Sequence, residues 1–537
     1  MSIPANTDVV IVGASWAGIW MLHQMRLLGL RAYLIEARAG VGGVWFYTHY
    51  PGCRVDTEVP FYEFAAPELW RHWNWKERFA KREDIQKYLE AVCDRLDLWP
   101  HITLGTLITG ASWDDDEKRW HVSTSDGTII KSQFFVPCTG YSTVPVYPTY
   151  DGIGRFKNGF HTSRWPENLD VARKRVGIIG TGASGTQVIE AIAPKVAHLT
   201  VFQRTPNLAT PRSQVQYSTQ EFKRVKEHYP YLFEQRLSTF GVDCPNRRPR
   251  TFDDDPETRH ALYDGLYRTG GLSFWFRNYA DMTTDSRANQ EAYNFWRSRT
   301  LPRIRDPDVA SKLAPAVPPH AFGIKRPSLE TEYFEVFNQS NVSLIDLGDD
   351  PLVRETAHSV VCQDSGSHEF DILIYATGFD FVTASVLQMD IRGRNGLILS
   401  EKWNTDVDSS GIWTYLGIMS AGFPNMFFPV GPQAPTALGI TPFMAELQGR
   451  WISDIVRHLR TEGKTTVEPT SDSEVWWKNE LISSAYETLF PQTNSWYMGV
   501  NVPRRKKEPR CYLGGVDRYA KFLDESAVDG YQDCSFE

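Results

Sequence analysis

Two glycine-rich turns, at residues 13–18 and 180–185, lie far apart in this chain. The first reads Gly-Ala-Ser-Trp-Ala-Gly and the second Gly-Thr-Gly-Ala-Ser-Gly, and each follows a β-branched apolar run and opens an apolar helical pattern. A strand, a glycine turn and a helix form the unit that holds a dinucleotide pyrophosphate at a helix N-terminus. Two such units predict an α/β fold with two Rossmann-like dinucleotide-binding domains, and two cofactors that exchange electrons.

The residues that follow the two units carry opposite charges. The strand predicted over 32–35 ends at Glu36, and a carboxylate at this place is the expected partner of ribose hydroxyls. The strand predicted over 199–202 leads instead towards Arg204 and Thr205. Because a guanidinium can form a fork with a 2′-phosphate, the second nucleotide is predicted to be NADP rather than NAD.

Further patterns indicate that both domains are discontinuous in sequence. The apolar runs 133–137 and 370–375 each lead into a Thr-Gly junction, which suits a chain that crosses from one nucleotide domain to the other. Helices are predicted over 19–28 and 186–193, directly after the glycine turns. From 206 to 322 the pattern changes to polar helices rich in Tyr and Trp. We expect this part to be a helical insertion that shapes an access route.

Composition limits the possible partners. The 537 residues carry a formal net charge of -8, and nucleic acids and anionic lipids recruit Lys and Arg clusters instead, so neither is expected as a partner. The seven cysteines are scattered without a Cys-x-x-Cys pair, which disfavours a disulfide framework, a dithiol redox centre and a metal site. No hydrophobic signal segment precedes the first strand, so a cytoplasmic location is expected.

One uncharged stretch, between Asp408 and Glu446, is long enough to span a bilayer. Four prolines, at 424, 429, 432 and 435, interrupt any continuous helix there, and irregular backbone exposed to lipid leaves polar groups unsatisfied. We therefore predict a buried strand over 426–430, a turn and a buried helix.

Residues 42–56 indicate a family. They read Gly-Gly-Val-Trp-Phe-Tyr-Thr-His-Tyr-Pro-Gly-Cys-Arg-Val-Asp. This stretch resembles the active-site motif of the type I Baeyer-Villiger monooxygenases, flavoproteins related to cyclohexanone and phenylacetone monooxygenases. The resemblance runs nearly end to end and includes the segments 161–166, 203–207, 323–326, 376–378, 421–425 and 495–497.

The resemblance implies an oxidoreductase that uses FAD, NADPH and O2. Its partner would be a small ketone, converted to an ester or lactone through a C4a-peroxyflavin and a Criegee intermediate. A FAD-binding domain is then expected over 1–140 and 385–537, an NADP-binding domain with linkers over 141–205 and 325–384, and the helical insertion over 206–324. A monomer or weak oligomer is expected.

The resemblance also assigns candidate roles to single residues. Arg326 is the candidate catalytic cation, because a guanidinium keeps its proton and can stabilise developing negative charge without titrating. Asp56, at the end of the motif, would orient it. His161 and Trp165 would couple the domains, and Thr436, Ala437 and Leu438 would line the substrate pocket. The candidate cofactor-binding residues are Gly13, Ser15, Gly18, Glu36, Gly43, Val44, Trp45, Tyr50, Asp56, Tyr62, Thr181, Gly182, Ser184, Gly185, Thr186, Gln187, Arg204, Thr205, Lys325, Arg326 and Trp496.

Three other functions share parts of this pattern. A flavin monooxygenase that oxygenates nitrogen or sulfur carries both glycine turns, whereas Asp56, the Lys325-Arg326 pair and Trp165-Pro166 favour ketone oxygenation. A flavin reductase or NADPH oxidase without an oxygenated product is a second alternative. A cofactor-binding protein without turnover is the third.

Overall fold

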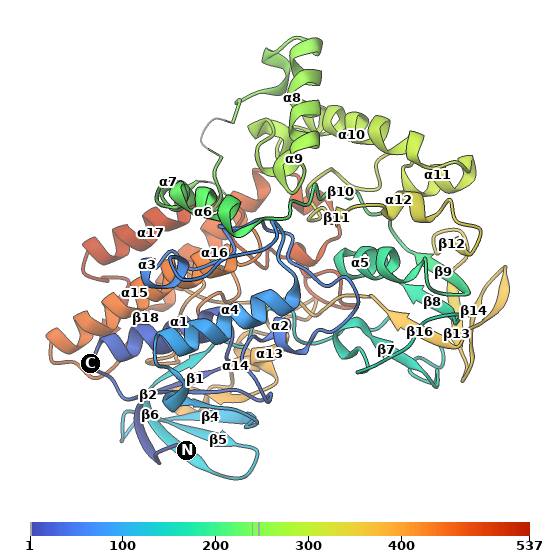
Figure 1. Cartoon of the computed structure of the whole chain (residues 1–537). Helices are drawn as coiled ribbons and strands as arrows, with labels where there is room; N and C mark the ends of the chain where they lie inside the picture. Colours follow the sequence, from blue (N-terminus) through green and yellow to red (C-terminus); the bar gives the residue numbers. More distant parts are fainter. Residues whose placement is uncertain (1–2, 239, 245–246) are drawn as a thin grey trace.

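Two separate β-sheets organise the chain, one behind each glycine turn (Figure 1). The computed structural model describes residues 3–238, 240–244 and 247–537. The first sheet has the strand order β17-β4-β5-β6-β1-β2-β3, and the second has the order β12-β9-β8-β16-β7. In Figure 1 the first sheet lies at the bottom, the second lies at the right, and the helical segment drawn in green rises above them.

The first sheet is built around the strand that leads into the first glycine turn. Its strands are β1 (Asn6–Val12), β2 (Ala32–Ile35), β3 (Ile102–Thr103), β4 (Ile108–Asp114), β5 (Arg119–Thr124), β6 (Ile129–Pro137) and β17 (Asp390–Arg392). β1 pairs in parallel with β2 on one side and with β6 on the other. Val9, Val10 and Ile11 are fully buried, as expected for the centre of a parallel sheet covered on both faces.

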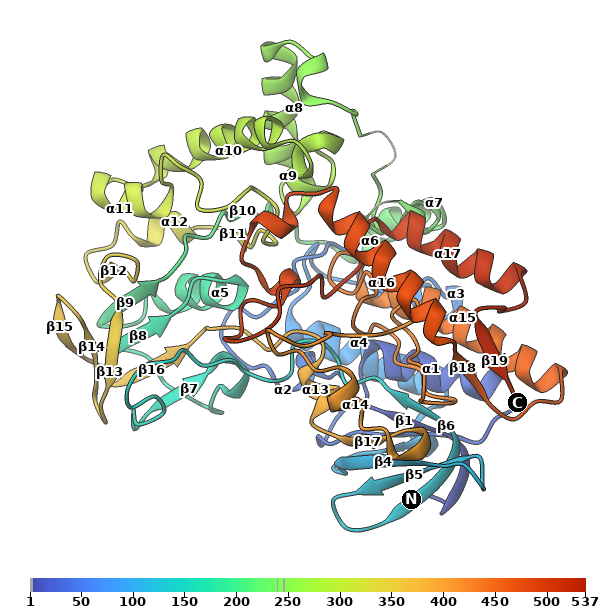
Figure 2. The ribbon, with the colours of Figure 1, turned by 180° about the vertical axis from the view of Figure 1, so that it is seen from behind.

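Helices from both ends of the chain cover this sheet. α1 (Trp16–Leu27) follows the first turn and packs against α15 (Thr441–Thr461), more than 400 residues later. From behind, α15, α16 (Ser471–Tyr486), α17 (Val516–Val528), β18 (Val467–Pro469) and β19 (Cys534–Phe536) lie over the same part of the molecule (Figure 2). The first unit is therefore assembled from segments that lie far apart in the sequence.

The second sheet repeats the same plan. It contains β7 (Gly159–His161), β8 (Arg175–Ile179), β9 (His198–Gln203), β12 (Val342–Asp346) and β16 (Ile372–Tyr375), and all its pairings are parallel. α5 (Ala183–Ile192) follows the second glycine turn. A separate antiparallel sheet of β13 (Leu352–Glu355), β14 (Ser359–Cys362) and β15 (Gly366–Glu369) lies beside the second sheet, at the right of Figure 1. The predicted α/β fold with two Rossmann-like units is confirmed. The domain limits themselves stay a prediction.

The segment that follows β9 is mainly helical. Its helices include α6 (Thr219–Glu227), α7 (Tyr229–Glu234), α8 (Pro256–Thr269), α9 (Ser273–Phe276), α10 (Ser286–Thr300) and α11 (Pro307–Leu313). Aromatic rings hold these helices together; Phe274 stacks on Phe295 at 5.5 Å, and Phe240 stacks on Phe276 at 4.6 Å.

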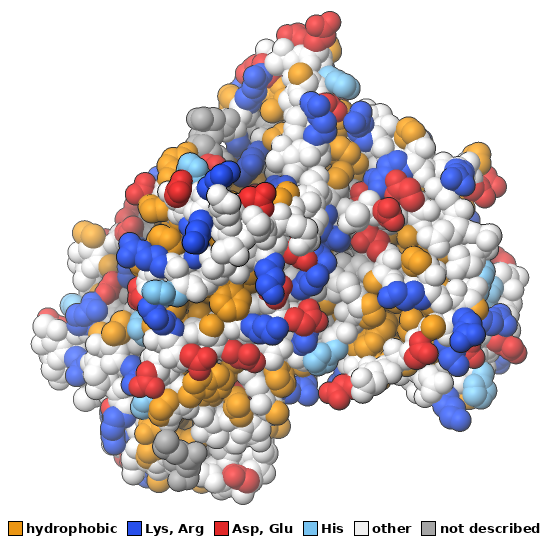
Figure 3. Space-filling model, viewed as in Figure 1, with side chains coloured by type: hydrophobic (Ala, Val, Ile, Leu, Met, Phe, Trp, Pro, Cys, Tyr) orange, Lys and Arg blue, Asp and Glu red, His pale blue; other side chains and the backbone are white. Residues whose placement is uncertain are grey.

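Figure 3 shows Lys and Arg side chains interspersed with Asp and Glu, so neither sign of charge dominates the face in view.

The predicted strand over 426–430 is wrong. Met426 forms only an isolated bridge with Phe135, and the chain around it is buried but irregular. Asn425 and Val430 have φ of 55° and 56°, and the prolines at 424 and 429 lack the N–H that a ladder needs. The buried helix predicted after the turn is α15, which begins at Thr441. In the described ranges no helix has both the length and the hydropathy to cross a bilayer.

A buried polar cluster joins the helical segment to the first unit. Arg236 forms an ion pair with Glu446 of α15 at 3.0 Å, and its Nη2 donates to the carbonyl of Glu63 at 2.6 Å. The Glu63 side chain is fully buried, and both of its carboxyl oxygens lack a hydrogen-bond partner. Burial raises the pKa of Glu63 to about 8.

This pKa predicts a loss of stability as pH rises. The unfolded chain releases the Glu63 proton near 4.5 and the folded chain near 8, so the free energy of unfolding falls with pH between these values. Glu63→Gln keeps an uncharged side chain of similar shape. We expect its Tm to exceed that of the wild type by several degrees at pH 8, with a smaller gap at pH 5.5. Glu68→Gln, at an exposed position of α3 (Pro67–Trp70), is the control. Equal pH slopes in the wild type and Glu63→Gln would contradict the prediction.

Candidate active site

Arg326 and Asp56 form a two-pronged ion pair between distant segments. Arg326 Nε donates to Asp56 Oδ2 at 2.6 Å, and Nη2 donates to Oδ1 at 2.8 Å. The third nitrogen, Nη1, donates to the carbonyl of Ala437 at 2.9 Å. The loop over 50–56 at the end of the motif (the motif loop) and the loop over 436–438 therefore hold the guanidinium from two sides. The two-pronged contact with Asp56 is the geometry that makes Arg-carboxylate pairs strong and directional.

The surroundings keep this guanidinium charged. Burial lowers the pKa of Arg326, but the charge and hydrogen bonds of Asp56 outweigh burial and hold that pKa above its usual value. The side chains of Arg326 and Asp56 are 18% and 28% exposed, so the pair is partly accessible rather than sealed in the core. The site thus presents a permanent cation, and the catalytic role of Arg326 stays a prediction.

Aromatic side chains lie beside the pair, and others pack on these in turn. The guanidinium lies 5.9 Å from the ring centre of Trp275, and the Tyr497 hydroxyl donates to Ala437 at 3.5 Å. Trp496 stacks on Tyr497 at 3.8 Å and meets the edge of Phe381 at 4.5 Å. Trp496 was predicted from the sequence, but the other three rings were not. Trp275 and Phe381 are single aromatic residues without a distinguishing spacing, whereas Tyr497 lies in the matched 495–497 segment, which could have indicated it.

A cavity adjoins Asp56 on the side of the helical segment. Phe79, Val242, Leu272 and Phe276 supply apolar lining, and the polar lining residues are Asp56, Thr57, Glu58, Ser273 and Arg277. Residues 242 and 272–277 belong to the segment predicted to shape an access route. The predicted substrate residues Thr436, Ala437 and Leu438 are buried, and Ala437 faces the same guanidinium through its carbonyl. Their contact with a substrate stays a prediction.

The first glycine turn is closed by tight backbone contacts. A Cβ on Gly13, where φ is +102°, would lie 2.5 Å from the carbonyl oxygen of Cys138, and one on Gly18 would lie 1.8 Å from that of Gly13. Glu36 Oε2 accepts a hydrogen bond from the backbone N–H of Ala14 at 2.8 Å. The carboxylate thus lies beside the turn, where the sequence predicted a ribose partner.

The motif packs directly on this turn. Ser15, the N-cap residue of α1, donates through Oγ to the carbonyl of Gly42 at 3.2 Å, and Gly43 lies against the Ser15 side chain. Val44 begins α2 (Val44–Tyr47), and Trp45 Nε1 donates to the Tyr62 hydroxyl at 3.0 Å. The predicted cofactor residues of both segments therefore meet at one place.

The second turn leaves an open space at its centre. Cβ atoms on Gly180 and Gly185 would each come within 2.4 Å of a backbone oxygen, whereas one on Gly182 would meet nothing within 4 Å. Gly182 is the N-cap residue of α5, so this open space lies where a helix N-terminus favours an anion.

Polar side chains brace the second turn. Thr181 Oγ1 donates to the carbonyl of Thr205 at 3.0 Å, and Thr186 Oγ1 donates to the carbonyl of Thr181 at 3.3 Å. Asn207 Nδ2 also donates to the carbonyl of Thr181, at 2.6 Å, and to Ser328 Oγ at 2.7 Å. Asn207 was not predicted as a site residue, although it lies in the matched 203–207 segment.

Beyond this turn, the cation Arg204 lies close enough to Lys325 to affect the pKa of that lysine. Burial and then the positive charge of Arg204 lower the pKa of Lys325 to about 8. Like charges that are held together in a partly desolvated place fit an anionic ligand, which removes the repulsion when it binds. The residues of this turn and these two cations therefore suit a nucleotide with a 2′-phosphate.

His161 and Trp165 occupy the edge of the second sheet. The His161 ring is fully buried, with Nε2 3.1 Å from the carbonyl of Gly378 and Nδ1 accepting from the Ser163 N–H at 3.2 Å. Burial lowers the pKa of His161 to about 4, so the ring is neutral at neutral pH. Trp165 packs edge-on against Phe160. These contacts fix the exit after β16, and a coupling role between domains stays a prediction.

Comparisons with known proteins place this geometry in a family. Residues 10–235 match the pyridine nucleotide-disulphide oxidoreductase family. The chain is 37% identical over 533 residues to cyclopentanone 1,2-monooxygenase from Comamonas sp., covering 99% of this chain and 96% of that protein. It is 34% identical to a Baeyer-Villiger monooxygenase from Pseudooceanicola batsensis, covering 99% and 96%. The chain belongs to the Baeyer-Villiger monooxygenases.

A solved structure supports the same conclusion for the whole fold. The structure of cyclohexanone monooxygenase from Rhodococcus sp. Phi1 bound to NADP+ matches with a TM-score of 0.94 and 34% identity, covering 100% of both chains. The two sheets, the helical segment and the C-terminal helices therefore follow the arrangement of a Baeyer-Villiger monooxygenase.

The Lys325 pKa predicts how NADPH affinity depends on pH. Above about pH 8 the free protein loses the Lys325 proton, so NADPH binding weakens as pH rises through this value. Lys325→Met should remove this slope and weaken NADPH binding on the order of 10- to 100-fold, because it deletes a charge-assisted contact. Titrations of NADPH and NADH from pH 6.5 to 9.5 check this. NADH, which lacks the 2′-phosphate, is the control, and an equal loss for both nucleotides would contradict the assignment.

Proposed function

We propose that this protein oxygenates a ketone to an ester or lactone, with FAD as its bound cofactor and NADPH and O2 as co-substrates. The balanced reaction is ketone, O2, NADPH and H+ to ester, NADP+ and water. The observation that carries the proposal is the Arg326–Asp56 pair, a permanent cation fixed by Asp56 and the Ala437 carbonyl, with Asp56 lining a small cavity of mixed polar and apolar character. FAD, once bound and reduced by NADPH, supplies the chemistry that activates oxygen.

The protein itself contributes fixed charge and orientation. Negative charge develops on the carbonyl oxygen of a ketone when an oxygen nucleophile attacks its carbon, and a preorganised cation stabilises that charge. Arg326 serves this role because its pKa stays above its usual value. Asp56 and the Ala437 carbonyl hold the guanidinium in one orientation, so little reorganisation accompanies the reaction.

The cofactor sites follow from the two turns. Residues 1–140 and 385–537 would bind FAD, with Glu36 on the ribose, and residues 141–205 and 325–384 would bind NADP, with Arg204 and Lys325 on the 2′-phosphate. The Gly182 space at the start of α5 supports the second assignment. The segment 206–324 would cover the route to Asp56, since its residues line the cavity there.

We further propose a cytoplasmic enzyme that is a monomer or weak oligomer. The seven cysteines are all free thiols, and six of them are buried, which suits a reducing compartment. Size-exclusion chromatography with light scattering checks the oligomeric state.

Arg326→Ala tests the role of the cation. The change deletes the group that stabilises developing charge, so ester formation should fall on the order of 100-fold or more, while NADPH still reduces the flavin. Arg326→Lys keeps the charge but loses the two-pronged contact, and we expect an intermediate yield. Product mass and flavin bleaching are measured in parallel. Normal ester yield from Arg326→Ala would refute the assigned role.

A panel of ketones, sulfides and amines tests the reaction itself. Cyclic and open-chain ketones should raise NADPH consumption and yield products heavier by one oxygen atom. Oxygenation of sulfides or amines without any ester would favour the nitrogen- or sulfur-oxygenating alternative. NADPH consumption without an oxygenated product would favour an oxidase.

A further inference from the structure

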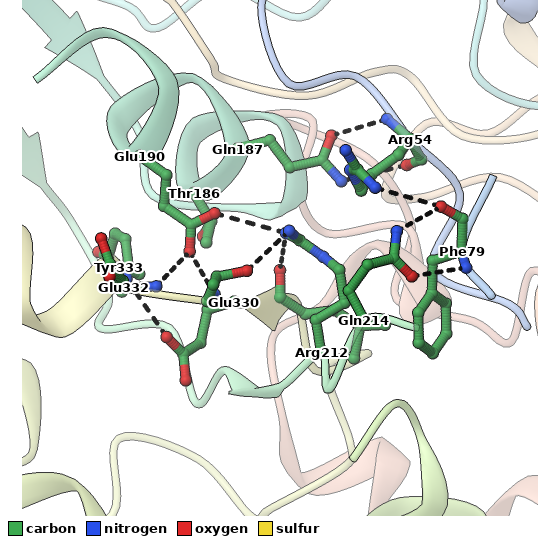
Figure 4. Close-up of polar contacts among 12 residues, drawn as sticks. Arg54, Phe79, Thr186, Gln187, Glu190, Arg212, Gln214, Glu330, Glu332 and Tyr333 are labelled. Atoms are coloured by element: carbon green, nitrogen blue, oxygen red, sulfur yellow. Dashed lines mark hydrogen bonds and ion pairs between the residues drawn. The ribbon is translucent and has the colours of Figure 1, made fainter. Parts of the chain in front are cut away.

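Gln187 of α5 reaches from the second unit to the loop that carries Asp56 (Figure 4). Its Oε1 accepts from the Tyr50 hydroxyl at 3.0 Å and from the Arg54 N–H at 3.4 Å, and its Nε2 donates to the Arg54 carbonyl at 3.1 Å. Both lone pairs of the amide oxygen and one of its two N–H groups are therefore engaged by a single loop. The side chain is buried, so these bonds are shielded from water.

The loop and the helix are also in steric contact. Gly52 has a φ of +84°, and a Cβ there would lie 3.0 Å from the backbone oxygen of Gln187. In the first turn of α5, Ser184 Oγ donates to the Tyr50 hydroxyl at 3.2 Å. The motif glycine thus permits backbone contact with the helix that begins at the Gly182 space.

Arg54 and α5, which Gln187 links, are each also bonded to other segments. Arg54 Nη1 donates to Glu77 Oε2 at 2.8 Å and to the Phe79 carbonyl at 3.2 Å, which fixes the loop to the first unit. On α5, Glu190 accepts from the Thr331 N–H at 2.6 Å, five residues after Arg326. Figure 4 shows Gln187 in contact with Arg54, Arg54 in contact with Phe79, and Glu190 of the same helix in contact with the segment at Glu332. A shift of α5 would therefore displace both the loop before Asp56 and the segment after Arg326.

We propose that Gln187 is a positioning residue that sets the Asp56–Arg326 pair by fixing the backbone of Arg54 to the helix whose N-terminus receives the NADP pyrophosphate. Arg54 stands two residues before Asp56, so the path from nucleotide to cation is short. This role rests on the proposed function. Without the Gln187 side chain, the loop over 50–56 relaxes. A larger share of turnovers then follows the side reaction in which NADPH, H+ and O2 give NADP+ and hydrogen peroxide.

Gln187→Leu tests this role with two readouts. The first is hydrogen exchange of the peptide over 50–56 in the FAD-loaded enzyme without NADP, which should become several-fold faster because the Arg54 N–H loses its acceptor. The second is hydrogen peroxide formed per NADPH with a ketone that the wild type oxygenates, which should rise at least threefold. Gln220→Leu, the same substitution at an exposed position of α6, is the matched control and should leave exchange over 50–56 unchanged.

Gln187→Glu is a second variant of closely similar shape. Its carboxylate can still accept from Tyr50 but faces the Arg54 carbonyl without a proton to donate, so it should also raise the peroxide fraction. Lowering the pH protonates this carboxyl group and should restore coupling, an effect that a nonspecific loss of structure would not produce.

The outcomes separate the two proposals. Unchanged exchange over 50–56 in Gln187→Leu overturns the proposed positioning role of Gln187, and so does faster exchange with an unchanged ratio of peroxide to ester. A wild type that forms no ester from any ketone overturns the proposed function and, with it, the role in oxygen transfer. The exchange result then still decides whether Gln187 holds the loop.

Discussion

The ion pair between Arg326 and Asp56 is the constraint on which the site depends. A guanidinium in a partly buried place is costly unless its donors are satisfied, and here two of them meet one carboxylate while a third meets the Ala437 carbonyl. These partners come from residues 56, 326 and 437, and they meet only if both units and the C-terminal part of the chain are assembled. Removing one partner leaves an unpaired, partly buried charge, so the pair ties site geometry to the global fold.

The same packing solution appears behind both glycine turns. Gly13 lies against the carbonyl of Cys138, at the exit from β6, and Gly180 lies against the carbonyl of Ala376, at the exit from β16. In each unit the strand beside the turn ends where a Cβ on the glycine would clash. The two Thr-Gly junctions in the sequence therefore mark the same structural position in two units, and the open edge that each leaves suits a nucleotide.

Most periodic features were predictable from the sequence, whereas contacts outside matched motifs were not. β2 was predicted residue for residue, because a parallel strand buried on both faces is a continuous apolar run bounded by polar residues. α1 and α5 begin three residues earlier than predicted, at Trp16 and Ala183, since the helices start inside the glycine turns. The apolar run at 426–430 also resembled a strand, but positive φ angles and prolines limit it to one bridge.

Site residues divide in the same way. The Arg326–Asp56 pair was predicted because both residues lie in matched motifs, and the structure brings them together. Trp275 and Tyr497 were missed, since their positions depend on how the helical segment and the C-terminal loops pack. Two adjacent residues of the site, Lys325 and Arg326, also lie in opposite electrostatic surroundings.

Lys325 and Arg326 are neighbours in sequence, yet only one of them can titrate near neutral pH. Burial and the Arg204 charge bring the pKa of Lys325 to about 8, whereas Asp56 holds that of Arg326 above its usual value. Under the proposed roles, a lysine suits the first place because a 2′-phosphate would restore its charge on binding, and an arginine suits the second because it would stay charged throughout turnover. If the proposed roles hold, the pH sensitivity of these two cations belongs to nucleotide binding rather than to the charge proposed to face the ketone.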